Sequence, residues 1–335
     1  MGKRKFENQE VLKGVYFLLS GSVRLTKDGN QFWDGVFKID SDNELKAKIW
    51  DYKGRVEKLK NSLLPKKFYK VQGKIDTSYN NEPQLIVFSI DPADSDTIDL
   101  SSFTKKSQIP TEDMVKEFDK IVSEMEDKDY RKLLETFRND SLFDKYIRSP
   151  AAKMIHHDWI SGLLEHSLTL ARAIIFLHPL YLSLNKDLLL CGAFLHDVGK
   201  VFEISQEIGF DYTTDGNLMG HIYLGAKYVE SLIDKIENFP EEKRKVISHL
   251  ILSHQGYRAD GFGSPVDPAT LEATFFHHLD NLDAKTRHIL SAISDQEPQD
   301  GFIKTSFPLS LKIYVGGTDC REVNKEKIKK SLFDD

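Results

Sequence analysis

Cysteine is scarce in this chain, and the marks of several protein classes are missing. Its 335 residues include two cysteines, Cys191 and Cys320, which cannot form a disulfide framework and favour a reducing compartment. No apolar run reaches the length of about 18 residues that a transmembrane helix needs. The charged residues 1–5 are not followed by an apolar segment, which argues against a signal peptide. We therefore expect a cytoplasmic protein without membrane contact.

Positive charge is not in excess either. The net charge of −6 argues against a protein that coats nucleic acid through charge alone. The charge is unevenly distributed, because residues 1–110 carry 19 lysines and arginines but 15 aspartates and glutamates. A mildly basic first part joined to an acidic second part fits a binding module attached to a metal-holding module. Chance fluctuation is the alternative, and charge alone does not separate the two.

Histidine is absent from the first 155 residues. All eleven histidines lie between His156 and His288. Because histidine is the commonest metal ligand, this clustering predicts that the chemistry belongs to the second part of the chain.

Five short stretches within residues 11–92 are rich in β-branched and aromatic residues and are separated by turn signals. This pattern predicts a small five-stranded barrel of the OB type that binds nucleic acid. Trp33, Phe37 and Trp50, interleaved with lysines such as Lys48, could form a stacking platform for a single strand. The alternative is that these aromatic side chains fill the barrel.

The rest of the chain predicts mainly helices. Residues 93–150 read as a linker followed by helices that either connect the two modules or pack on the second. Residues 151–297 predict an all-α bundle, and residues 298–335 a C-terminal tail with a strand and a charged helix. The predicted fold class is a multidomain α and β chain in which an OB-like barrel precedes a helical domain.

A histidine and an aspartate stand side by side in Leu195-His196-Asp197-Val198-Gly199-Lys200, where a helix is expected to end at Gly199. At a fraying last turn both side chains can reach one target, because the backbone leaves helical geometry there. Imidazole and carboxylate groups are good ligands for divalent metals. We therefore expect this pair to begin a metal centre.

Four residues on other predicted helices are further ligand candidates. They are His166, His221, His254 and Asp280. Burying any one of them without a partner is costly, and any one alone would more often be a satisfied core residue. A shared metal cluster would satisfy all of them together.

The neighbouring polar residues have weaker claims. His249 is about 140° around its helix from His254, so we prefer His254 as the ligand. His277 fits a supporting position behind a ligand, and Asp283 an ion pair with Arg287. His156 and His157 suit a cap or surface role, with contact to a substrate phosphate as the alternative. His178 and His288 read as structural or solvated.

Six blocks of sequence stand in a fixed order. They are His156-His157-x4-Gly162-Leu163-Leu164-Glu165-His166-Ser167, Leu195-His196-Asp197-Val198-Gly199-Lys200, Gly220-His221-Ile222, Leu250-Ile251-Leu252-Ser253-His254-Gln255-Gly256, Gly263-Ser264-Pro265-Val266 and Asp280-Asn281-Leu282-Asp283-Ala284-Lys285. Together they resemble the bacterial YhaM-type 3′–5′ exoribonucleases, which place an OB-fold before an HD domain. The HD domain is named for its His-Asp pair and marks a superfamily of metal-dependent phosphohydrolases.

The resemblance implies an activity and a set of roles. The enzyme would hydrolyse single-stranded RNA, or single-stranded DNA, from the 3′ end to nucleoside 5′-monophosphates through metal-activated hydroxide. Asp197 would bridge two divalent ions, and Lys200 would offset charge on the phosphoryl oxygens. The first ion would be bound by His166, His196 and Asp280, and the second by His221 and His254. Substrate would be contacted by Trp33, Phe37, Lys48, Trp50, His156, His157 and Ser264.

The ligand types fit Mn²⁺, with Fe²⁺, Co²⁺ or Zn²⁺ as alternatives, better than Mg²⁺ alone. One departure from the family concerns Gln255, because the family commonly has a second histidine there. If that histidine were a ligand, the second ion would bind more weakly in this chain.

Two other functions stay open at this stage. One is an HD-domain phosphohydrolase that acts on small nucleotides or cyclic dinucleotides, and the other is a non-catalytic nucleic-acid-binding protein. The sequence also leaves open whether RNA or DNA is preferred, which metal is native, and whether a homo-oligomer forms.

Overall fold

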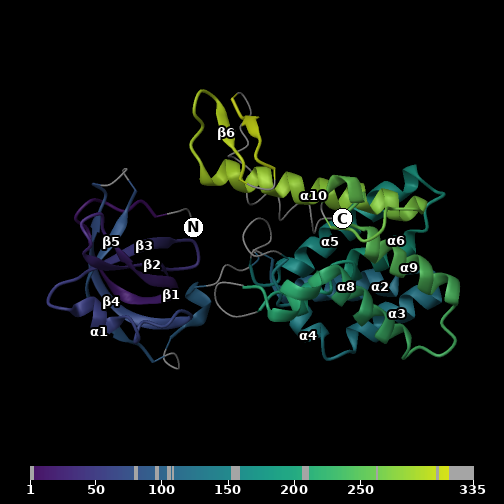
Figure 1. Cartoon of the computed structure of the whole chain (residues 1–335). Helices are drawn as coiled ribbons and strands as arrows, with labels where there is room; N and C mark the ends of the chain where they lie inside the picture. Colours follow the sequence, from purple (N-terminus) through teal and green to yellow (C-terminus); the bar gives the residue numbers. More distant parts are fainter. Residues whose placement is uncertain are drawn as a thin grey trace. The chain divides into compact units, whose positions relative to one another are not determined.

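The computed structural model describes residues 4–78, 82–94, 98–103, 107, 109–151, 159–205, 211–261, 263–306 and 309–316. These residues form two compact units, each with its own hydrophobic core (Figure 1). One unit holds a closed barrel of five strands, and the other is built mainly from helices, which confirms the predicted fold class. In the part of the chain described, no helix combines the length and apolar character needed to cross a membrane. His156, His157, Cys320 and the helix expected near the C-terminus lie outside the described residues.

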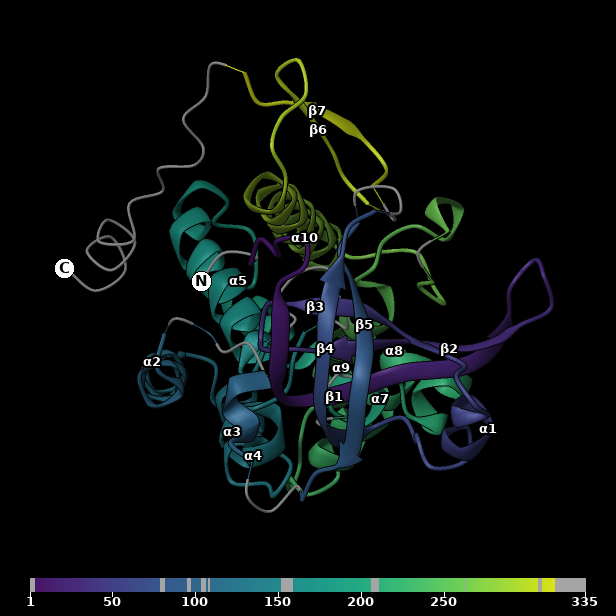
Figure 2. The ribbon, with the colours of Figure 1, turned by 90° about the vertical axis from the view of Figure 1, so that its left-hand side faces the viewer.

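The barrel has one long strand and four shorter ones. They are β1 (Val11–Leu25), β2 (Gln31–Lys38), β3 (Glu44–Trp50), β4 (Lys67–Asp76) and β5 (Gln84–Pro92). Their order around the barrel is β1-β2-β3-β5-β4. The first half of β1 pairs with β4 and the second half with β2, so β1 bends around the barrel (Figure 2). The parallel pairing of β3 with β5 completes the ring.

Alternate side chains of β2 and β3 point into the barrel, as the period of a strand requires. Trp33 is 2% exposed and Phe37 is fully buried, so neither ring can stack on a ligand. The predicted stacking role was therefore wrong for these two residues, and they fill the barrel instead. Gly21 and Gly35 make room for the indole, since a β-carbon at either position would lie within 2.4 Å of the Trp33 ring.

A short helix, α1 (Arg55–Leu59), separates β3 from β4 and was not expected from the sequence. It is anchored by Val56, whose side chain is fully buried and whose backbone N–H donates to Asp51 Oδ1 over 2.8 Å. Two apolar residues in a five-residue turn are too few to show a helical periodicity, so only its packing on the barrel identifies this turn.

The second unit begins with helices that the sequence left as connectors or as packing elements. They are α2 (Thr111–Ser123), α3 (Lys128–Arg138) and α4 (Phe143–Tyr146). Their apolar faces carry buried residues such as Met114, Phe118 and Phe137. These side chains belong to the same core cluster as those of the later helices, so the three helices pack on the second module.

Six of the described helices contribute to the polar centre described below. They are α5 (Gly162–Leu177), α6 (Lys186–Leu195), α7 (Lys200–Glu203), α8 (Thr214–Ile233), α9 (Glu241–Ser253) and the long α10 (Leu271–Asp295). Helix α8 is capped by Thr213, whose hydroxyl accepts from Gly216 N. Helix α10 starts after its N-cap Thr270, whose side chain accepts from Ala273 N.

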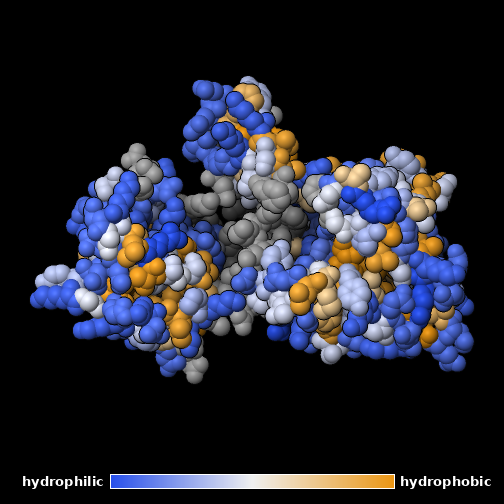
Figure 3. Space-filling view, in the orientation of Figure 1, coloured by the Kyte–Doolittle hydropathy of each residue, from blue (hydrophilic) through white to orange (hydrophobic). Residues whose placement is uncertain are grey.

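The C-terminal part contains a small hairpin. Strand β6 (Phe302–Lys304) pairs antiparallel with β7 (Lys312–Tyr314), which lies within the stretch expected to be extended. Ile303 packs with Ala292 and Ile293 of α10 in a separate small cluster. The visible surface of both units is mostly hydrophilic, with smaller hydrophobic patches (Figure 3).

Candidate metal centre

The His-Asp pair lies in the turn that follows α6. The side chain of Asn185 caps the start of this helix by accepting from Leu188 N. His196 and Asp197 come directly after its end and are 0% and 3% exposed. Successive tight turns, Val198 N to Leu195 O and Lys200 N to Asp197 O, then lead the chain into α7.

Gly199 has a different role from the helix-ending one that the sequence suggested. Its φ of −62° is an ordinary right-handed value, so no left-handed cap is formed here. A β-carbon at this position would lie 1.9 Å from His221 O and 2.5 Å from Gly225 N. The glycine therefore allows α8 to approach the turn closely, and this approach brings His221 beside Asp197.

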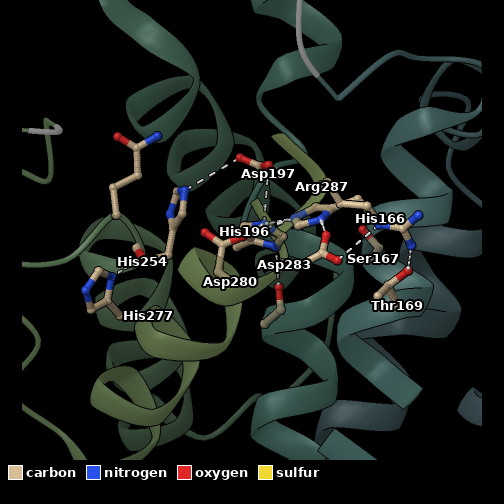
Figure 4. Close-up of polar contacts among 12 residues, drawn as sticks. His166, Ser167, Thr169, His196, Asp197, His254, His277, Asp280, Asp283 and Arg287 are labelled. Carbon is tan, nitrogen blue, oxygen red and sulfur yellow. Dashed lines mark hydrogen bonds and ion pairs between the residues drawn. The ribbon is translucent and has the colours of Figure 1, made fainter. Parts of the chain in front are cut away.

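Four other elements bring the remaining candidates to this turn. His166 lies in α5, His221 follows a kink at Gly220 in α8, His254 directly follows α9, and Asp280 lies in α10. Figure 4 shows His166, His254 and Asp280 gathered around Asp197 and His196. The structure thus brings together all six predicted ligands.

We call His166, His196 and Asp280, together with Asp197 Oδ2, the first site. His166 Nε2 lies 3.3 Å from His196 Nε2 and 3.1 Å from Asp280 Oδ1. His196 Nε2 lies 3.3 Å from Asp197 Oδ2 and 3.9 Å from Asp280 Oδ1. His166, His196 and Asp197 each offer a ligand atom within 4.8 Å of the others, so this group could hold one ion.

We call His221 and His254, together with Asp197 Oδ1, the second site. The Nε2 atoms of both histidines lie 3.5 Å from Asp197 Oδ1. These three residues form the other group whose ligand atoms lie within 4.8 Å of one another. Asp197 thus belongs to both sites and turns one oxygen toward each.

The Nδ1 atom of each of the four histidines is held from behind. His166 Nδ1 lies 2.8 Å from Asp283 Oδ2, and His221 Nδ1 lies 3.1 Å from Glu203 Oε1. His196 Nδ1 lies 3.0 Å from Gly192 O, and His254 Nδ1 lies 2.7 Å from Ile251 O. When a ring is neutral, an Nδ1 that donates to an oxygen leaves the lone pair on Nε2, and the four Nε2 atoms lie on the side of the centre. Metal-binding histidines are oriented in this way.

Asp197 Oδ1 is the clearest sign that this centre fits divalent ions. The atom is buried and has no hydrogen-bond partner among the described residues. Its two nearest nitrogens, at 3.5 Å, are too far for a good hydrogen bond. A buried carboxylate oxygen without a partner is costly. A cation coordinated by this oxygen and the facing imidazoles would remove that cost, and mixed nitrogen and oxygen ligands suit Mn²⁺, Fe²⁺, Co²⁺ or Zn²⁺.

Lys200 stabilises the charge on the same aspartate. Its Nζ lies 2.5 Å from Asp197 Oδ2. Burial by itself would raise the pKa of Asp197, but the charges of Lys200 and His196 outweigh it and hold the pKa well below its usual value. Burial would lower the pKa of Lys200, but Asp197 raises it above its ordinary value. The carboxylate and the ammonium group therefore both stay charged at neutral pH.

The first site stores a proton in the metal-free protein. Burial would lower the pKa of His166, but hydrogen bonds to Asp280 and Asp283 outweigh it and raise the pKa to about 9. Burial would raise the pKa of Asp280, but the hydrogen bond from His166 lowers it to about 2. His196, which is buried without so close a carboxylate pair, has a lowered pKa. An ion that binds here must displace the His166 proton.

Two residues at the centre were missed by the sequence reasoning. Glu203 lies at the end of α7 and accepts hydrogen bonds from both the backbone N–H and Nδ1 of His221. Asp283, for which an ion pair with Arg287 was expected, lies with its Oδ1 3.4 Å from Arg287 Nε and also binds His166. The spacing of Asp283 three residues after Asp280 was the available signal, whereas nothing near Glu203 indicated its role.

His277 supports the second site from behind. Its Nδ1 lies 3.1 Å from the backbone oxygen of His254, as Figure 4 also shows. His249 accepts a hydrogen bond from Ala269 N and is not part of the centre. Ser264 is 6% exposed, and its hydroxyl has no partner among the described residues. A methyl group on the adjoining Gly263 would lie 3.6 Å from Gln255 Oε1, so this loop lies close to Gln255.

The barrel keeps two of its four predicted substrate contacts at the surface. Trp50 is 46% exposed, and its ring centroid lies 5.3 Å from that of Phe32. Lys48 Nζ lies 5.7 Å from both ring centroids. Beside this group, a groove of about 770 Å³ is lined by residues that include Ser20, Ser22, Arg24, Asp34, Lys46 and Lys48.

Comparison with known families agrees with this geometry. Residues 163–285 match the family model of the HD domain. The matched segment contains all six predicted ligands as well as Lys200, Glu203 and Asp283. The chain therefore carries an HD domain that follows a five-stranded barrel in the sequence, and this domain indicates a metal-dependent phosphohydrolase.

Proposed function

We propose that this HD domain hydrolyses single-stranded RNA from its 3′ end and releases nucleoside 5′-monophosphates. The observation that carries the proposal is Asp197, whose two oxygens face two separate groups of imidazole nitrogens. A double site of this kind suits in-line displacement at a phosphodiester, where the attacking and the leaving oxygen both need stabilisation. The barrel in the same chain supports a polymeric substrate over a small nucleotide.

The chemistry is the addition of water to the last phosphodiester linkage. Two divalent ions, when bound, would lower the pKa of water and polarise the phosphoryl oxygens. Water attacks the phosphorus atom and loses a proton, and the bond to O3′ of the preceding nucleotide breaks. That O3′ takes up a proton, so a 5′-monophosphate and a shortened RNA with a free 3′-hydroxyl result.

The protein residues have distinct parts in this reaction. The four histidines, Asp197 and Asp280 would hold the ions, and Asp283 and Glu203 keep His166 and His221 in orientation. Lys200, buried and charged beside Asp197, would offset negative charge that develops on the phosphoryl oxygens.

An aromatic pair on the barrel, the exposed Trp50 and the half-buried Phe32, supports binding of a single strand. Trp50 and Phe32 offer ring faces on which bases can stack, and Lys48 adds a cation beside them. Two cations of the neighbouring groove are already paired, since Arg24 lies 3.3 Å from Asp34 and Lys46 lies 2.6 Å from Glu82. We therefore expect stacking to contribute more than phosphate contacts.

The direct test is product analysis with labelled RNA in the presence of Mn²⁺. An RNA labelled at its 5′ end should shorten stepwise, and one labelled on its 3′-terminal nucleotide should release labelled 5′-monophosphate at once. A 3′-terminal phosphorothioate linkage should slow both. Turnover of mononucleotides or cyclic dinucleotides with no shortening of RNA would contradict the proposal.

A second test concerns the barrel. Trp50→Ala should weaken binding of a single-stranded RNA by about 1–3 kcal/mol, since one stacked base contributes that much. Hydrolysis of a dinucleotide should be unchanged. Phe88→Ala, which removes a 53% exposed aromatic ring elsewhere on the barrel, is the matched control. Equal losses in the two variants would argue against a role for the Trp50 surface.

A further inference from the structure

We infer that Gln255 weakens binding of a divalent ion at the second site by occupying the ligand atom of His221. Gln255 Nε2 lies 3.1 Å from His221 Nε2. This is the same nitrogen that faces Asp197 Oδ1 over 3.5 Å. The inference rests on the proposed two-ion centre and concerns how that centre is loaded.

The direction of this hydrogen bond follows from the other side of the imidazole ring. Glu203 Oε1 can only accept, so His221 Nδ1 carries the proton of the neutral ring. His221 Nε2 is then an acceptor, and the amide nitrogen of Gln255 must donate to it. An ion that takes the His221 lone pair has to break this bond first.

The position of Gln255 is fixed by its neighbours in the chain. It stands between the ligand His254 and Gly256, whose φ is +93°. A β-carbon at Gly256 would lie 2.2 Å from the ring of His277, so the turn packs tightly against α10. His277 in turn donates to the backbone oxygen of His254. The amide is therefore presented to the second site by a rigid turn.

The first site has a different donor that cannot bind a cation, because Lys200 Nζ lies 2.5 Å from Asp197 Oδ2. His166 Nε2 and His196 Nε2 lie close to Asp197, Asp280 and each other. All of these are potential ligands of the same ion, whereas the amide N–H of Gln255 cannot bind a cation. Removing Gln255 should therefore change the affinity of the second site and leave the first site unchanged.

The experiment is a Mn²⁺ titration of the full-length protein after treatment with a chelator. Binding is measured by calorimetry and by the electron paramagnetic resonance signal of free Mn²⁺. Gln255→Ala should tighten the weaker class of binding about 2- to 12-fold, which corresponds to a net hydrogen bond of about 0.5–1.5 kcal/mol. Gln255→His, which replaces the donor by a third imidazole, should tighten it further. Gln31→Ala on the barrel, where the glutamine is exposed, is the control and should change nothing.

His166→Ala assigns the two classes, because it should remove the first-site class and keep the one that responds to Gln255. Unchanged or weaker binding in Gln255→Ala would overturn the inference, and weaker binding would make the amide oxygen a ligand. Because the readout is ion binding, a protein that binds two ions but does not cleave RNA would contradict the proposed function without touching this inference.

Discussion

The first and second sites are built on the same plan and differ in what surrounds them. Each has one histidine held by a carboxylate and one held by a backbone carbonyl, and each faces one oxygen of Asp197. The first site adds Asp280, which lies 3.1 Å from His166 Nε2. The second site instead has the neutral amide of Gln255 against His221 Nε2.

This difference indicates that the two sites are not equivalent. A second carboxylate favours cation binding by charge, and it also holds the proton of His166 when no ion is present. The amide adds no charge and competes for a ligand atom. Ion binding at the first site therefore competes with the His166 proton, and binding at the second site also competes with the Gln255 hydrogen bond. Substitution of His166 or of Gln255 separates the two effects.

Asp197→Asn should have the largest effect, because Asp197 belongs to both sites. Replacing one carboxylate oxygen by an amide nitrogen removes ligand charge and puts a donor where an ion should bind. We expect both classes of Mn²⁺ binding to weaken. The loss of one group that stabilises the transition state typically lowers the rate about 10²–10³-fold, and we expect RNA hydrolysis to fall by more than this. Asp119→Asn, which changes an exposed aspartate of α2, is the control. Retention of one tight ion would show that Asp197 is not shared.

A pH series on the metal-free protein should isolate the first site. The pKa of His166 is raised from 6.5 to about 9, so its contribution to stability is complete below pH 6.5 and is lost as the pH rises through 9. The free energy of unfolding should fall by about 3 kcal/mol over this interval. Urea unfolding with a chelator present, at pH 6.5 and 9.5, measures it.

His166→Gln provides the comparison for that series. His254 contributes in the same direction, because Asp197 raises its pKa although burial would lower it. The variant should therefore reduce the pH dependence without removing it. An unchanged pH dependence would mean that the proton is held elsewhere.

The smallest expected effects come from the two carboxylates behind the sites. Asp283→Asn should weaken ion binding at the first site and Glu203→Gln at the second, each about 10-fold, which is the lower end of the range for such supporting residues. The amide oxygens can still accept from Nδ1, so mainly the charge is lost. Mn²⁺ titration of both variants tests whether each substitution weakens its own site more than the other site. An equal loss of affinity at both sites in either variant would show that the sites are not separable.

The sequence anticipated much of the fold because periodicity is a local property. The five strands and most helices were indicated by alternating or helical spacing of apolar residues. Which side chains of the strands point into the barrel and which point to the surface was less predictable. Trp33 and Trp50 have similar local surroundings in the sequence, yet one fills the barrel and the other lies on its surface. Strand register decides this, and a shift of one residue exchanges the faces.

The residues that meet at the centre could be predicted, but the groups behind most of them could not. Buried histidines and aspartates on apolar helices indicate a shared ion because no other local group satisfies them. Glu203 and Gln255 are ordinary polar residues by sequence, and their roles depend on the approach of α8 to the turn at Gly199. That approach brings together residues near Gly199 and residues near His221, and the local spacing of apolar residues does not indicate such a contact.

The amino-acid sequence by itself determined the two-part architecture, which histidines and aspartates gather at one centre, and the broad chemistry that an HD domain indicates. Only the tertiary structure decided how those ligands divide between the two oxygens of Asp197 and which neutral or charged group stands behind each imidazole. The physical reason is that ligand identity depends on residue type and burial, which local sequence encodes, whereas the direction of a lone pair depends on contacts between distant helices.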